Sequence, residues 1–134
     1  MKEGDDIRRA MILIADDHDE NVVLLTRILQ RNGYTRLMGV TDSRQIAEQV
    51  KKLAPDLILL DLHMPHLDGF DVMEQLQPDL PPGFPVLLVT GEVDDQTRRE
   101  ALSRGASEVL TKPYEVGKVL DVVERLLRAW LPRA

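Results

Sequence analysis

The chain has 134 residues, no cysteine and a formal net charge of −6. This length suits one domain, and the absence of cysteine excludes disulfides and cysteine-ligated zinc, so any metal ion needs oxygen or imidazole ligands. The negative net charge disfavours direct nucleic-acid binding. No apolar stretch approaches the roughly 20 residues of a membrane span, and the charged N-terminus lacks the apolar segment of a secretory signal peptide. We therefore expect a cytoplasmic protein that acts on a protein partner.

Short apolar runs alternate with helical patterns along the whole chain. The predicted elements, in order, are a strand at 11–15, a helix at 20–31, a strand at 35–40, a helix at 46–54, a strand at 57–60, a helix at 70–76, a strand at 85–89, a helix at 95–103, a strand at 108–110 and a helix at 116–130. Four of the strand-length runs show little polar alternation, which is typical of strands covered on both faces, whereas 35–40 is less apolar and predicts an edge. Asp42 or Ser43 is expected to cap the second helix. Five repeats of strand then helix indicate an α/β fold with a parallel sheet and right-handed crossovers.

Polar side chains follow four of these strands at the point where each strand ends. Asp16 and Asp17 follow the first run, Asp61 the third, Thr90 the fourth and Lys112 the fifth. The carboxyl ends of parallel strands share one edge of the sheet, where such folds bind ligands, so we expect these five groups to converge.

Three carboxylates at such an edge repel one another unless a cation or protons neutralise them. Mg²⁺ prefers oxygen ligands and binds proteins through one or two carboxylates together with phosphate oxygens. A carboxylate can also attack phosphorus, a reaction that depends mainly on positioning and electrostatics. A lysine and a cation can supply positive charge for that reaction, and a threonine can supply a hydroxyl donor.

Four segments carry a resemblance to a known family: MILIADDHDEN, DLILLDLHMPHLDGF, PVLLVTGEVD and GASEVLTKPY. Taken together, they make the chain similar to a response-regulator receiver domain from residue 11 to about residue 129. The resemblance implies a flavodoxin-like three-layer sandwich, in which five helices flank a five-stranded parallel sheet of order 2-1-3-4-5. It divides the chain into an N-terminal tail at 1–10, a receiver domain at 11–130 and a C-terminal tail at 131–134.

The resemblance also implies an activity. Asp61 would accept a phosphoryl group from a histidine kinase or a phosphotransfer protein in a reaction that needs Mg²⁺ or Mn²⁺. The domain would then switch conformation and control an output partner or domain, as a regulatory module that catalyses only its own phosphorylation and dephosphorylation. The cation would contact Asp17, Asp61 and the backbone carbonyl of His63, while Asp16 would act mainly through metal-bound water. Lys112 would pair with the phosphoryl group.

Further positions take roles from the same resemblance. Thr90 would hydrogen-bond a phosphoryl oxygen, and Gly91 would leave room for it. His63 and Glu92 would face the attacking water and tune the phosphoryl lifetime. The Lys112–Pro113 bond would be cis, a form found in only about 5–6% of X-Pro bonds.

The predicted switch comprises Thr90, Val109 and Pro113. The family often carries an aromatic residue at the position of Val109, where it swings inward when the threonine moves, so the smaller Val109 changes the exposed surface less. A homodimer through residues 94–130 is a further expectation, whereas the cognate kinase, the output and the oligomeric state are not determined by the sequence.

Other kinds of protein fit these residues less well. A haloacid dehalogenase-type phosphatase needs an aspartate where His63 stands, and the acidic loop after the first strand would repel the phosphate of a flavin. His18, His63 and His66 could suggest a zinc site, but surface histidines are the simpler interpretation. A receiver-like docking module that is never phosphorylated remains the main alternative function.

Overall fold

The computed structural model describes residues 7–91 and 93–133 and contains one parallel sheet between two layers of helices. The strand order is β2-β1-β3-β4-β5, as predicted. The strands are β1 (Met11–Ala15), β2 (Arg36–Val40), β3 (Leu57–Leu60), β4 (Val86–Thr90) and β5 (Glu108–Thr111). The helices are α2 (Asp19–Arg31), α3 (Ile46–Leu53), α4 (Gly69–Leu76), α5 (Asp95–Ser103) and α6 (Val116–Trp130), with short 3₁₀ turns at Ser43–Gln45, Gln77–Asp79 and Leu131–Arg133.

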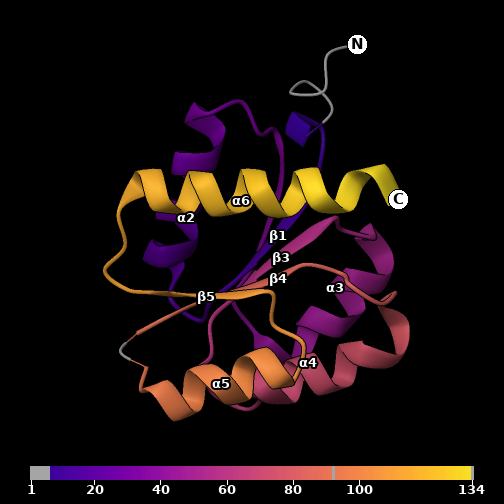
Figure 1. Ribbon diagram of the computed structural model, residues 1–134, viewed down its shortest axis with the longest axis vertical. Helices are drawn as coiled ribbons and strands as arrows, with labels where there is room; N and C mark the ends of the chain where they lie inside the picture. The colour runs from indigo at the N-terminus through magenta and orange to yellow at the C-terminus, as the bar shows by residue number, and fades with distance from the viewer. Residues whose placement is uncertain (1–6, 92, 134) are drawn as a thin grey trace.

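The sheet is covered on both faces, because successive strand residues point to opposite sides. In β1, Leu13 and Ala15 belong to one core, and Ile12 and Ile14 belong to the other. The first core lies under α3, α4 and α5, and the second lies under α2 and α6 (Figure 1). The continuous apolar runs therefore form strands buried on both faces, as expected for a parallel sheet.

The edge strand and the helix starts also follow from the sequence. β2 pairs only with β1 and is largely exposed, which confirms its predicted edge position. The side chain of Asp42 accepts a hydrogen bond from the backbone N–H of Arg44 and so caps the 3₁₀ turn that leads into α3. Asp68 and Asp71 form a reciprocal capping box at the start of α4, and Asp94 caps α5. Each cap satisfies backbone N–H groups that would otherwise lack a partner at a helix start.

The ends of the domain differ from the expected tails. Ile7 and Ala10 are buried in the second core, and Arg8 donates hydrogen bonds to the carbonyl of Asn32 and the hydroxyl of Tyr34. At the other end, the partly buried Leu131 packs against both cores. Isolated apolar residues in a charged segment give no periodic pattern, so their contacts arise only when the chain folds.

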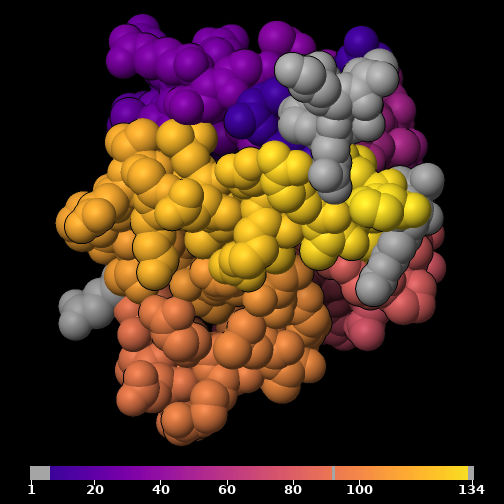
Figure 2. Space-filling view, turned by 45° about the horizontal axis from the view of Figure 1, so that its top comes forward, coloured from indigo at the N-terminus to yellow at the C-terminus, as the bar shows by residue number. Residues whose placement is uncertain are grey.

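The last helix, α6, covers one side of the molecule and begins four residues after Lys112 (Figure 1). Figure 2 shows α6 crossing this side, with the violet part of the chain that includes α2 above it and the orange part that includes α5 below it. Within the described residues, no helix is both long enough and apolar enough to cross a membrane.

Candidate functional site

The residues that follow the strands converge at one edge of the sheet. The backbone N–H of Asp16 donates to Val40 O, and that of Asp61 donates to Ala15 O at 2.9 Å, so both residues continue the ladders of β1 and β3. The side chains of this edge are buried: Asp16 is 2% exposed, Asp61 is 5% exposed and Thr90 is fully buried. The shared edge predicted from the order of strands and polar residues is therefore present.

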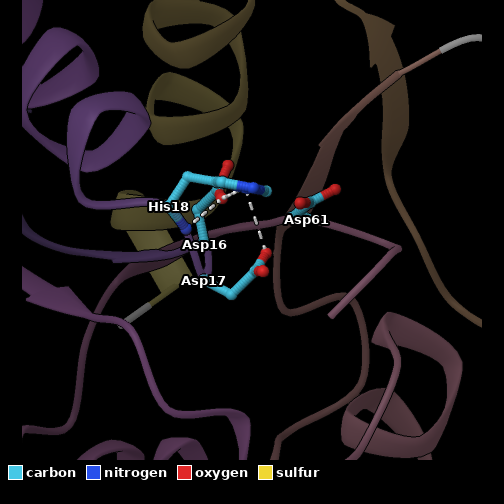
Figure 3. Close-up of side chains that lie close together, drawn as sticks. All are labelled: Asp16, Asp17, His18 and Asp61. Atoms are coloured by element: carbon cyan, nitrogen blue, oxygen red, sulfur yellow. Dashed lines mark hydrogen bonds and ion pairs between the residues drawn. The ribbon is translucent and has the colours of Figure 1, made fainter. Parts of the chain in front are cut away.

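A cluster of potential ligand atoms lies at this edge. Asp16, Asp17, His18 and Asp61 each offer one ligand atom, and these four atoms lie within 4.8 Å of one another (Figure 3). Lys112 reaches in from the fifth strand, with its Nζ 2.8 Å from Asp16 Oδ2 and 3.7 Å from Asp61 Oδ2. Three carboxylates and one ammonium group leave two negative charges, which one divalent cation would neutralise.

Two buried oxygens at this site have no hydrogen-bond partner among the described residues, namely Asp17 Oδ1 and Thr90 Oγ1. A buried polar atom without a partner costs about 1–3 kcal/mol, so such atoms point to a ligand that binds here. The donor set is made of oxygens and one imidazole, which fits a divalent cation. The residues present therefore suit the cation that the sequence predicts.

The protonation of Asp61 reflects its surroundings. Burial raises the pKa of the Asp61 carboxyl, the nearby Lys112 lowers it, and Asp16 raises it further. The net pKa lies above the ordinary value of 3.8 because a buried carboxylate next to another acid is costly to ionise. A cation beside Asp61 would favour the ionised form, which is the form that can attack phosphorus.

The loop between β3 and α4 packs tightly against the acceptor strand. A Cβ atom at Gly69 would lie 2.9 Å from both Asp61 O and Leu62 Cα, so only glycine fits there without moving backbone. The Gly69 N–H donates to Leu62 O at 2.7 Å. Ser43 holds the middle of the loop, since its hydroxyl donates to the carbonyl of Pro65 and accepts from the backbone N–H of Leu67.

The other predicted positions lie around this cluster. The backbone N–H of His63 donates to Asp61 Oδ1 at 3.3 Å, while its side chain is exposed. A Cβ atom added at Gly91 would meet no described atom within 4 Å, apart from the neighbouring residues of the chain. The Lys112–Pro113 bond is cis, as predicted. Glu92 lies outside the described residues.

The position of the expected aromatic switch residue is fully packed. Val109 is 6% exposed and belongs to the first core. Arg98 of α5 donates a hydrogen bond to the carbonyl of Val109 at 2.9 Å and another to the hydroxyl of Thr111 at 3.2 Å. The side chain of Arg98 therefore links α5 to β5 beside the strand that leads to Lys112.

His18 is the residue at this edge whose role was not predicted. Its Nδ1 lies 3.4 Å from Asp16 Oδ1 and 3.3 Å from Asp17 Oδ1, although the side chain is 57% exposed. His63 and His66 are also exposed but, unlike His18, are not part of the cluster found among the described residues. The only signal in the sequence was the position of His18 directly after two aspartates, which does not show where an imidazole points.

The fold and the site together define a doubly wound α/β domain with an acidic, lysine-containing pocket at the carboxyl edge of its sheet. The family model for the response regulator receiver domain matches residues 12–124. The chain therefore belongs to the receiver-domain family of response regulators, which are the proteins of two-component signalling.

Curated relatives agree with this assignment. The chain is similar to the alkaline phosphatase synthesis transcriptional regulatory protein PhoP of Bacillus subtilis, with 33% identity over 87% of the chain and 48% of that protein. It is also similar to the sensory/regulatory protein RpfC of Xanthomonas campestris, with 30% identity over 90% of the chain and 17% of that protein. The chain thus spans about half of the first relative and a smaller part of the second.

Solved structures show the same fold. The signal receiver domain of a signal transduction histidine kinase from Syntrophus aciditrophicus matches with a TM-score of 0.79 and 32% identity, covering 90% of this chain and 91% of that one. The signal receiver domain of a LuxO repressor protein from Vibrio parahaemolyticus matches with a TM-score of 0.83 over 90% of this chain and 92% of that one. At 24% identity, the second comparison shows the fold alone.

Proposed function

We propose that the chain is a phosphoacceptor switch and that Asp61 is the acceptor. The observation that carries this proposal is the position of the buried Asp61 carboxylate, which lies at the strand edge 3.7 Å from Lys112 Nζ and within the acidic cluster. A carboxylate oxygen of Asp61 attacks the phosphorus of a phosphohistidine on a histidine kinase or phosphotransfer protein. The new O–P bond forms as the N–P bond breaks, and the imidazole leaves with the electron pair of that bond.

The chain's own groups position the phosphoryl group in this proposal. Asp16, Asp17, Asp61 and the backbone carbonyl of His63 would hold Mg²⁺ or Mn²⁺, with Asp16 acting mainly through water. The cation, when bound, supplies positive charge to the transferring phosphoryl oxygens. Lys112, which contacts Asp16 and Asp61, supplies a second positive charge at the same edge.

The proposed switch begins at Thr90. Its buried hydroxyl has no hydrogen-bond partner in the described part of the chain, so it is available to donate to a phosphoryl oxygen on the neighbouring strand. Movement of Thr90 would be transmitted to β5, which contains Val109 and is followed by Pro113. Arg98 joins this strand to α5. Phosphorylation then shifts an existing equilibrium between two conformations.

The surface formed by residues 94–130 would carry the output of this switch. It includes α5, β5, Lys112 and α6, and it begins four residues after Thr90. We propose that it contacts an output partner or a second copy of the chain. The proposed setting is the cytoplasm, where histidine kinases present their phosphoryl groups.

We assign control of the phosphoryl lifetime to His63 and Glu92, which stand two residues after Asp61 and Thr90. His63 is exposed beside the acceptor, and Glu92 occupies the corresponding place after β4. Replacement of both residues should change the rate of autodephosphorylation in the presence of Mg²⁺. An unchanged rate would remove this part of the proposal.

The decisive experiment is incubation of the purified chain with acetyl phosphate and Mg²⁺, followed by intact-mass analysis. We expect the mass to increase by one phosphoryl group and the increase to disappear in Asp61→Asn or when the cation is chelated. Asp121→Asn, an exposed change on α6, is the matched control and should be phosphorylated normally. Phosphorylation of Asp61→Asn at another residue would refute the assignment, and an unmodified wild-type chain would favour the docking-module alternative.

A further inference from the structure

The acidic cluster contains one nitrogen ligand that the proposed function does not use. His18 stands directly before α2, and in Figure 3 its ring extends over the carboxylates of Asp16 and Asp17 towards Asp61. We propose that His18 is a metal ligand and that its imidazole strengthens the binding of transition-metal ions such as Zn²⁺ and Co²⁺ more than it strengthens the binding of Mg²⁺. This inference rests on the proposed function, because both use the same carboxylates.

The distances around His18 suit a shared metal ion better than a hydrogen bond. Its Nδ1 lies 3.3 Å from Asp17 Oδ1 and 3.4 Å from Asp16 Oδ1. Good N–H···O hydrogen bonds measure about 2.7–3.2 Å. In a tetrahedral zinc site with bonds of about 2.0–2.1 Å, neighbouring ligand atoms are about 3.3–3.4 Å apart. Adjacent ligands of an octahedral Mg²⁺ are only about 2.9 Å apart. The two distances from His18 Nδ1 thus match the spacing of neighbouring ligands around a tetrahedral ion.

The hydrogen bonds around the cluster leave the same atoms available. Lys112 binds Asp16 through Oδ2, so Asp16 Oδ1 faces His18 and accepts the backbone N–H of His18 at 2.9 Å. A carboxylate held in this way by neighbouring groups is oriented for ligation. Asp17 Oδ1 is buried and accepts no hydrogen bond from the residues that the structure describes. This oxygen lies 3.3 Å from His18 Nδ1, so the imidazole and the Asp17 carboxylate face the same point of the pocket.

The chemistry of the donor set decides which ion is preferred. Carboxylates, carbonyls and water suit Mg²⁺ and Mn²⁺, whereas imidazole suits Zn²⁺, Cu²⁺ and Ni²⁺. An imidazole added to carboxylates therefore strengthens binding along the series of first-row transition metals more than it strengthens binding of Mg²⁺. The two net negative charges of the cluster with Lys112 are neutralised equally by any divalent ion, so charge alone does not discriminate.

The test compares His18→Asn with His66→Asn in the full chain. Asparagine removes the imidazole, suits the helix-capping position of residue 18, and tolerates the positive φ of 72° at residue 66. His66 is the matched control because it is an exposed histidine outside the cluster. Binding of CoCl₂, ZnCl₂ and MgCl₂ is measured by calorimetry, and bound Co²⁺ is followed by its visible absorption, which is stronger in a tetrahedral site.

We expect His18→Asn to bind Co²⁺ and Zn²⁺ at least about 10-fold more weakly, to lose the strong Co²⁺ absorption, and to bind Mg²⁺ within about two-fold of the unchanged chain. His66→Asn should match the unchanged chain for all three ions. Equal Co²⁺ and Zn²⁺ affinities in His18→Asn and the unchanged chain would overturn the inference, and so would an equal loss in His66→Asn. Absence of Mg²⁺ binding by the unchanged chain counts against the proposed function instead, and the Co²⁺ comparison then decides this inference on its own.

Discussion

Replacement of Asp61 by asparagine should stabilise the metal-free protein even though it removes the proposed acceptor. The Asp61 carboxylate is buried within a cluster that holds two other carboxylates, and burial together with Asp16 raises its pKa against the opposing effect of Lys112. Asparagine at this position would keep the shape of the side chain and remove the charge. The folded state therefore loses a repulsion that the unfolded chain does not have.

The size of this effect follows from the distances. Ligand atoms of Asp16 and Asp17 lie within 4.8 Å of Asp61, and each like-charge pair at that separation costs about 3.5 kcal/mol at an effective dielectric constant of 20. Lys112 Nζ, at 3.7 Å, contributes about 4.5 kcal/mol of attraction on the same scale. The balance is a repulsion of about 2–3 kcal/mol, so Asp61→Asn should raise the free energy of unfolding by about 2 kcal/mol at pH 7.

The assay is urea unfolding in the presence of a chelator. It can be followed by the fluorescence of Trp130, which is buried and packs edge-to-face against Phe84. Asp121→Asn controls for the loss of one exposed charge. In MgCl₂ the advantage of Asp61→Asn should shrink, because the cation binds and stabilises the unchanged folded protein. A metal-free Asp61→Asn protein that is equally stable or less stable than the unchanged chain would refute the electrostatic reasoning.

Three further outcomes are expected. Because the pKa of Asp61 is raised in the folded state, the folded protein holds the proton of this carboxyl more strongly than the unfolded chain does. Protonation of Asp61 therefore stabilises the fold fully below the ordinary pKa of 3.8, and this stabilisation is lost as the pH rises through the folded-state pKa. The advantage of Asp61→Asn in metal-free urea titrations should therefore grow with rising pH, and an advantage that is constant with pH would contradict this. Gly69→Ala should lower the free energy of unfolding in urea by about 2 kcal/mol, because its Cβ would meet backbone atoms at 2.9 Å. Gly91→Ala, whose Cβ would meet no described atom, should change this free energy by no more than about 0.5 kcal/mol. Equal effects of the two substitutions would show that the acceptor loop is not tightly packed. Thr90→Val should abolish the conformational change on phosphorylation seen by NMR, because it removes the buried hydroxyl that is proposed to donate to the phosphoryl group. A phosphorylated Thr90→Val protein that shows the same change as the unchanged chain would contradict this role.

The convergence of the site could be predicted because it depends on order along the chain. Each apolar run is long enough for one buried strand, and the polar residue directly after it must lie at the carboxyl edge of a parallel sheet. Asp16, Asp61 and Thr90 therefore reach one edge whatever the details of the loops. Helix starts were also predictable where a capping side chain is local, as at Asp42.

Contacts between distant segments could not be predicted in the same way. Arg98 reaches from α5 to the carbonyl of Val109, and no periodic pattern in either segment marks this hydrogen bond. Ile7 and Ala10 likewise join the second core from a segment whose charge suggested a tail. Such contacts depend on which surfaces the folded chain brings together.

The layer architecture and the set of acids, hydroxyl and amine at the strand ends were already specified by the order of residues, because hydrophobic period and chain order are local properties. Only the tertiary structure shows which oxygen of Asp16 accepts the hydrogen bond from Lys112 and which oxygen of Asp17 accepts none from the described residues. It also shows that the ring of His18 turns towards both aspartates. Side-chain direction depends on the packing and charge of neighbours from several strands. Those neighbours are assembled only when the sheet has formed.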